Sequence, residues 1–155
     1  MNKNIEKIKK IRLFILKQIN GLTSDQLNEI PRGFNNNIIW NLGHIVSALQ
    51  AICYKRAGLP VRIDDKYFTP FLPSSKPLSF IGSEETDTIR ELMISTIDIL
   101  QTDYAGHLFS NYTKSERIEE VYNIDVSNID DALAFLLYHE GFHSGYIMAI
   151  KRLVQ

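Results

Sequence analysis

The stretch from about Asp130 to Leu153 restricts the fold more than any other feature of the sequence. It is strongly apolar and contains no proline, and this pattern predicts one long helix. Residues four apart on a helix lie one above the other on a single face. His139 and His143 have this spacing, so their imidazoles can point at one common position, as two ligands of a divalent metal ion must.

The same letters, His139-Glu140-Gly141-Phe142-His143, spell the H-E-x-x-H signature of zinc proteases. Such proteases usually take their third ligand from further downstream. Only twelve residues follow His143, and none of them is His, Asp, Glu or Cys. A third metal ligand would therefore come from upstream in the chain, and a protease is disfavoured.

Apolar periodicity and helix-capping residues predict three further helices before this one. The predicted helices run from about Asn4 to Asn20, from after Asn35–Asn37 to Gly58, from Ser83 to about Tyr104, and from a cap at Ser127 almost to the end of the chain. Thr23 and Gln26 have capping-box spacing and predict a short helical turn after the first helix.

The connections between these helices differ in length. The segment Leu59–Gly82 holds four prolines and cannot be a helix, but it is long enough to cross the height of a bundle, so that the second and third helices run parallel. The segment Gly106–Val126 is irregular and is expected to hold short extended pieces. We therefore predict an all-α four-helix bundle with a long crossover between helices 2 and 3, as a single domain over residues 1–155.

Composition excludes several classes of function. A net charge of −1 gives no basic surface for nucleic acid. No stretch has the eighteen or so apolar residues of a membrane span, and the first residues lack the apolar core of a signal peptide. The single cysteine, Cys53, suits a reducing compartment. We expect a soluble, cytoplasmic protein without nucleic-acid or membrane partners.

The two remaining histidines are the candidates for a third metal ligand. His44 lies in the second predicted helix beside small or weakly polar residues, which leave room for a cavity. His107 follows Gly106 in a polar stretch, where a surface or capping role is expected. We choose His44 as the third ligand. The alternative to a metal is that the histidines are core residues hydrogen-bonded to tyrosines or carbonyl groups.

The sequence resembles the DinB-like proteins, a family of four-helix bundles. The resemblance rests on Ile39-Trp40-Asn41-Leu42-Gly43-His44-Ile45-Val46, on Phe71-Leu72-Pro73, and on His139-Glu140-Gly141-Phe142-His143-Ser144-Gly145. It implies a divalent metal ion (nickel, zinc or similar) bound by His44, His139 and His143. It also implies a homodimer, and several members of the family are metal-dependent thiol-transfer enzymes.

Three neutral imidazoles would leave the full charge of the ion in an apolar pocket, able to activate a thiol or a water molecule. Thiol transfer to, or hydrolysis of, a small electrophilic substrate both fit, and a non-catalytic metal- or ligand-binding bundle is the alternative. Cys53 lies about 180° around the helix from His44, so a transferred thiol would come from a low-molecular-weight cosubstrate. Glu140 is a candidate catalytic base; alternatively it is solvated or orients a ligand histidine.

The aromatic residues in the long crossover are expected to be buried, since four exposed rings would form an apolar patch. We expect Tyr67, Phe68, Phe71 and Phe80 to pack over the bundle. A further hypothesis is that part of this segment covers the metal cavity. Gly141 and Gly145, four residues apart on the last helix, would allow another helix or a second subunit to approach closely.

Overall fold

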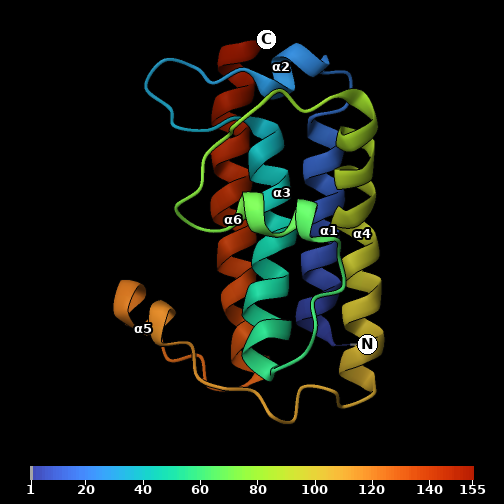
Figure 1. Ribbon diagram of the computed structural model, residues 1–155, viewed down its shortest axis with the longest axis vertical. Helices are drawn as coiled ribbons and strands as arrows, with labels where there is room; N and C mark the ends of the chain where they lie inside the picture. The colour runs from blue at the N-terminus through green and yellow to red at the C-terminus, as the bar shows by residue number, and fades with distance from the viewer. Residues whose placement is uncertain (1) are drawn as a thin grey trace.

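The chain forms a bundle of four long helices, as seen in a computed structural model that describes residues 2–155 (Figure 1). The long helices are α1 (Lys3–Gln18), α3 (Ile38–Leu49), α4 (Ser83–Ala105) and α6 (Ile129–Val154). No strand occurs among the described residues, so the all-α prediction is confirmed. None of the described helices has both the length and the apolar character needed to cross a membrane.

The four helices pack in a square, because α1 and α3 each contact both α4 and α6. In Figure 1, α1 and α6 run upward, whereas α3 and α4 both run downward. The connection from the lower end of α3 to the upper end of α4 climbs along the outside of the bundle and contains two short 3-10 turns, η3 (Asp65–Tyr67) and η4 (Thr69–Phe71). At its lower end α3 continues through a π-helical turn, η1 (Gln50–Tyr54), and a 3-10 turn, η2 (Lys55–Ala57).

Polar caps set the start of most helices. Asn37 caps α3 by accepting a hydrogen bond from the backbone N–H of Trp40, and Thr23 and Gln26 form the predicted capping box of α2 (Ser24–Asn28). The cap predicted for the last helix was wrong by one residue. The side chain of Asn128, not of Ser127, accepts from the N–H of Asp131, because an amide carbonyl reaches that N–H from the adjacent position.

The segment Gly106–Val126 contains a helix where extended pieces were predicted. Residues Glu116–Tyr122 form α5, which lies beside the lower half of the bundle in Figure 1. With seven residues, α5 is too short to show a clear apolar period in the sequence. The segments that flank α5 are joined by a backbone hydrogen bond of 3.0 Å, from the N–H of Ser115 to the carbonyl of Val126.

The core consists of two apolar clusters, one above the other, with a polar layer between them. The upper cluster includes Ile15 and Ile147, and the lower one includes Ile8 and Leu136. On each long helix, buried polar side chains lie near the boundary of the two clusters: Arg12 on α1, Asn41, His44 and Ser47 on α3, Thr96 on α4, and His139, Glu140 and His143 on α6. A buried polar layer is costly unless its members satisfy one another.

Three of the four crossover aromatics pack on the bundle as predicted. Tyr67, Phe68 and Phe71 are buried, whereas Phe80 is 58% exposed, so the packing prediction was wrong for Phe80. The packed part of the crossover also bonds to α3, since Ser47 Oγ donates to the carbonyl of Phe68 at 2.9 Å. This segment is thus fixed against the face of α3 that carries His44.

Candidate metal centre

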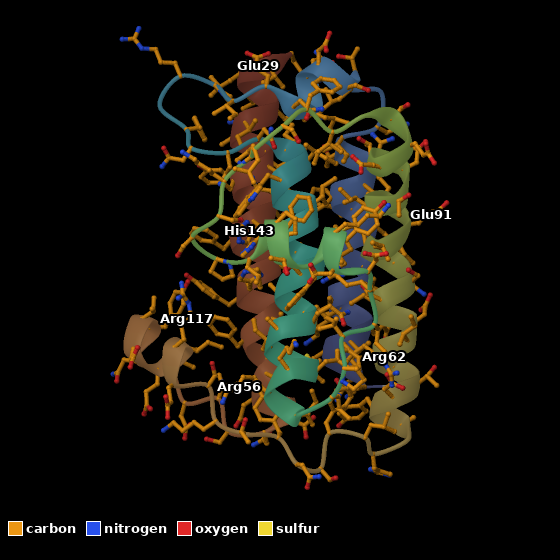
Figure 2. The ribbon with its side chains drawn as sticks, in the orientation of Figure 1. Glu29, Arg56, Arg62, Glu91, Arg117 and His143 are labelled. Carbon is orange, nitrogen blue, oxygen red and sulfur yellow. The ribbon has the colours of Figure 1, made fainter. Side chains whose placement is uncertain are left out.

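Three histidines from two helices meet in the polar layer. His44 on α3 and His139 and His143 on α6 are 6%, 9% and 8% exposed, and one nitrogen from each ring lies within 4.8 Å of those of the other two. The Nε2 atoms of His44 and His139 are 3.2 Å apart. Figure 2 shows His143 at mid-height of the bundle, on the side that faces the crossover. The structure thus brings together the three histidines that the sequence singled out.

Two of the rings are oriented by hydrogen bonds from Nδ1. His44 Nδ1 donates to the carbonyl of Phe71 at 2.7 Å, and His143 Nδ1 donates to Asn41 Oδ1 at 2.8 Å. Asn41 is held in turn, because its amide nitrogen donates to Asn36 Oδ1 and to the carbonyl of Asn37. With the proton on Nδ1, each Nε2 presents its lone pair to the centre of the cluster. Such outer hydrogen bonds are typical of metal-binding histidines.

His139 differs from the other two, because its Nδ1 is buried and has no hydrogen-bond partner among the described residues. Its Nε2 faces the Nε2 of His44. If both atoms present lone pairs, they repel each other unless a cation or proton lies between them. The cluster is therefore incompletely satisfied by its own hydrogen bonds, which is unusual for a buried polar group.

Burial lowers the pKa of all three imidazoles. Desolvation is the main cause for each, and it lowers the pKa of His139 to about 2 and that of His143 to about 3, with smaller contributions from the neighbouring histidines. The pKa of His44 is also lowered by desolvation, although its bond to the Phe71 carbonyl opposes the shift. The rings are thus neutral at neutral pH, the form in which imidazole binds a metal.

These residues fit a divalent ion. Two nitrogens bound at 2.0–2.1 Å to one zinc ion are about 3.3 Å apart at the tetrahedral angle, and the Nε2 atoms of His44 and His139 are 3.2 Å apart. Three histidine ligands without a fourth protein ligand leave a coordination position open, as in catalytic rather than structural zinc sites.

A cavity of about 370 Å³ opens next to the histidines, a size within the range of small-molecule pockets. One wall comes from α5 and another from α6, and most of the lining is apolar or aromatic. The lining residues are His44, Ala48, Ala51, Ile52, Lys55, Arg56, Pro73, Ser115, Arg117, Ile118, Val121, Tyr122, Phe135, Tyr138, His139, Phe142 and His143. An open metal position would face this cavity.

Glu140, the candidate catalytic base, is fully buried and is not among the residues that line the cavity. Its Oε1 accepts two hydrogen bonds from Arg12, at 2.6 Å and 2.9 Å. Burial raises the pKa of Glu140, and the adjacent guanidinium opposes that shift. Glu140 is therefore not solvated, and its contacts favour a role in orienting α6. The base role stays a prediction.

The other candidates of the sequence lie where they were expected. Cys53 is buried away from the cavity lining, and burial raises its thiol pKa to about 12. His107 is exposed just beyond the end of α4, where it adopts a left-handed backbone conformation (φ 57°).

Sequence reasoning missed two partners of the histidine centre and the buried partner of Glu140. Asn41 was noted only as a weakly polar neighbour, yet it orients His143. The Phe71 carbonyl lies 27 residues from His44 and left no signal in side-chain chemistry. Arg12 was detectable, because it is a cation on the apolar stripe of α1 that also carries Ile8 and Ile15, and such a residue needs a buried partner.

The architecture is that of a helical bundle with a buried three-histidine centre beside a cavity. The family model of the DinB superfamily matches residues 15–147. The chain therefore belongs to the DinB superfamily, as the sequence motifs indicated. The match includes all three histidines. A comparison with curated proteins finds no match to this chain.

Proposed function

We propose that His44, His139 and His143 bind one divalent metal ion, and that the centre catalyses thiol transfer to, or hydrolysis of, a small electrophilic substrate. The observation that carries the proposal is the convergence of three neutral, buried imidazoles on one point next to a cavity. A three-histidine centre with an open position, when loaded, lowers the pKa of a thiol or water molecule bound to it.

Several residues of the chain support this reaction by orienting the histidines and lining the cavity. Asn41 and the Phe71 carbonyl hold two rings in the tautomer that presents Nε2. The aromatic lining of the cavity, including Phe135 and Phe142, offers an apolar surface to the substrate. Since Cys53 is buried elsewhere and keeps its proton, the thiol in a transfer reaction would be a low-molecular-weight cosubstrate.

Three further features belong to this proposal. A homodimer is supported by the open face of α6, where a Cβ on Gly141 or Gly145 would meet nothing within 4 Å; light scattering that gives a monomer mass would contradict it. A cytoplasmic location remains in keeping with the single reduced cysteine. Nickel and zinc are both suitable ions, since imidazole binds either.

The test is the metal content of protein purified without an affinity tag or chelator. We expect about one equivalent of divalent metal, lost in each of the variants His44→Ala, His139→Ala and His143→Ala. His107→Ala is the matched control, because this histidine is exposed and lies outside the cluster. It should keep the full metal content.

The outcomes separate the two functional classes. Metal that is retained in the single variants, or absent from the wild type with no gain in stability on adding nickel or zinc, would contradict the metal centre and favour a non-catalytic bundle. If metal is present, the next experiment replaces it with cobalt. A thiolate-to-cobalt absorption band on adding small thiols would indicate the exchangeable position that an enzyme needs, and its absence with every thiol would favour hydrolysis or a structural metal.

A further inference from the structure

The charged residues seen to line the cavity beside the histidines are all cations. Its charged lining residues are Lys55 and Arg56, from η2 at the lower end of α3, and Arg117 from α5. Within residues 2–155, no aspartate or glutamate lines it, although the chain has 18 acidic residues against 17 lysines and arginines. The three histidines that line the cavity are neutral and add no charge. The cavity therefore has a net positive charge even before a metal ion binds.

The orientation of α5 strengthens this asymmetry. This helix carries four charged residues, three of them glutamates. Glu116, Glu119 and Glu120 do not line the cavity, whereas Arg117 does, together with the apolar Ile118, Val121 and Tyr122. The glutamates of α5 thus lie away from the cavity, whereas its single cation, which is exposed to solvent, borders the space that a substrate would occupy.

Arg56 and Arg117 both have N–H donors without a partner among the described residues. Arg117 makes no hydrogen bond or ion pair with any described residue. Arg56 uses Nε and Nη2 to hold the carbonyls of Thr113 and Lys114 and the hydroxyl of Thr113, and its Nη1 bonds to nothing in the described part of the chain. In Figure 2, Arg56 and Arg117 both lie near α5, whereas Arg62, which is paired with Asp103, lies across the bundle near α4. Guanidinium groups bind oxyanions through paired N–H donors.

We propose that the substrate of this site carries an oxyanion, a carboxylate or a phosphate monoester, recognised by Arg117 and Arg56, on an apolar body that lies against the aromatic wall of Phe135, Tyr138 and Phe142. This substrate class rests on the proposed function, because it assigns the same cavity. The metal centre would take the reacting group at one end of the molecule, and the arginines would hold the anion at the other. A neutral analogue would leave the cations of the cavity unpaired, which is the usual basis for rejecting it.

The test compares ligands that share a body and differ in charge. The probes are 4-phenylbutyrate, 3-phenylpropyl phosphate and 4-phenylbutan-1-ol, titrated calorimetrically into metal-free and into zinc-loaded protein at low salt. We expect at least one of the two anions to bind about tenfold or more tightly than the alcohol, a difference typical of one charged pair. The anion that binds more tightly identifies the oxyanion as a carboxylate or a phosphate monoester. The preference should weaken as salt is added, since the arginines are not deeply buried.

Variants assign the preference to residues. Arg117→Gln should reduce it to less than about threefold and leave the affinity for the alcohol unchanged, while Arg56→Gln should reduce it less, since that arginine also holds residues 113–114. Arg152→Gln is the matched control, with the same loss of charge at an exposed position near the end of α6, and it should keep the preference.

Equal affinities for the anions and the alcohol, a preference that persists in the Arg56→Gln/Arg117→Gln double variant, or no measurable binding of any probe to either form would overturn the proposal. Because the metal-free arm needs no ion, the two proposals fail separately. A protein without metal that still prefers the anion loses the metal centre only. A protein with a full metal content and no preference loses the oxyanion subsite only.

Discussion

His139 and Glu140 are neighbours in the sequence, but they belong to two buried polar groups that differ in charge and in packing. The histidine cluster (His44, His139 and His143) is neutral and borders a cavity. The ion pair of Arg12 and Glu140 is charged and fully buried, with both side chains 0% exposed. Adjacent residues on a helix point about 100° apart, so one helix serves both groups.

The hydrogen bonds show what each group does. Arg12 joins all four long helices: from α1 it donates to the carbonyl of Ile45 on α3, to Thr96 Oγ1 and the Met93 carbonyl on α4, and to Glu140 on α6. Each group leaves one buried atom without a partner among the described residues, Glu140 Oε2 and His139 Nδ1. In the histidine cluster, however, one nitrogen from each ring converges on a point beside the cavity. The difference indicates that the ion pair is a structural brace and that the histidines are arranged for a ligand.

The largest expected effect comes from breaking the brace. Arg12→Met leaves Glu140 buried without its counter-charge, and such a loss typically destabilises a protein by about 3–5 kcal/mol. Urea unfolding of the metal-free protein measures it. The double variant Arg12→Met/Glu140→Leu should recover most of the loss, because an apolar pair of similar volume removes the uncompensated charge.

The same variants test whether the ion pair and the histidine cluster act independently. Folded Arg12→Met protein should keep its metal content, since the histidines are held by Asn41 and the Phe71 carbonyl rather than by Arg12. A loss below about 1 kcal/mol, or a double variant that is no more stable than the single one, would show that the ion pair does not brace the bundle.

The next largest expected effect is a loss of stability of the metal-free protein at low pH. Desolvation lowers the pKa of His139 and His143 to about 2 and about 3 in the folded protein, whereas the unfolded chain titrates near 6.5. Between these values the unfolded chain binds more protons, so the stability that is complete above about pH 6.5 falls as the pH is lowered. From pH 7 to pH 5 each histidine should cost the metal-free protein about 2 kcal/mol.

Thermal unfolding of metal-free protein across this range checks the effect. His107→Gln should follow the wild type, because this histidine is exposed, while His139→Gln/His143→Gln should lose most of the pH dependence. Equal slopes for the wild type and the double histidine variant would show that other groups dominate the acid response.

Helical periodicity explains how much of this arrangement could be predicted from the sequence. The spacing of His139 and His143 and the small neighbours of His44 placed all three rings toward the core, and the cap at Asn37 set the start of α3. Such signals are local, because they depend on residues within one helix. The four long helices and the residues of the histidine cluster follow from them.

The parts that were missed depend on contacts distant in the sequence. α5 has seven residues, too few for periodicity. Its place as a wall of the cavity depends on ring contacts of Tyr122 with Phe135 and Tyr138 of α6. The pairing of Arg12 with Glu140 joins residues 128 apart. The hydrogen bond from His44 goes to a backbone carbonyl of the crossover, and carbonyl groups are the same in every residue, so no side-chain pattern marks the one that is used.

The smallest expected effect tests that crossover contact, and it comes from Gly43. An added Cβ would lie 2.4 Å from Cδ1 of the Phe71 ring, so Gly43→Ala must displace Phe71, whose carbonyl orients His44. Overpacking of this kind costs about 1–3 kcal/mol. Loss of an outer hydrogen bond typically weakens metal binding by about 10- to 100-fold, and a competition titration with a chelator measures it.

Gly82→Ala is the matched control, because Gly82 precedes α4, lies outside the proposed subunit face, and a Cβ there would meet nothing within 4 Å. Since alanine is a poorer N-cap than glycine, the change should cost up to about 1 kcal/mol and leave metal affinity unchanged. If Gly43→Ala weakens metal binding without affecting stability, the crossover acts mainly through His44. If it lowers stability alone, the Phe71 carbonyl does not orient the histidine, and the link between the crossover and the metal centre is lost.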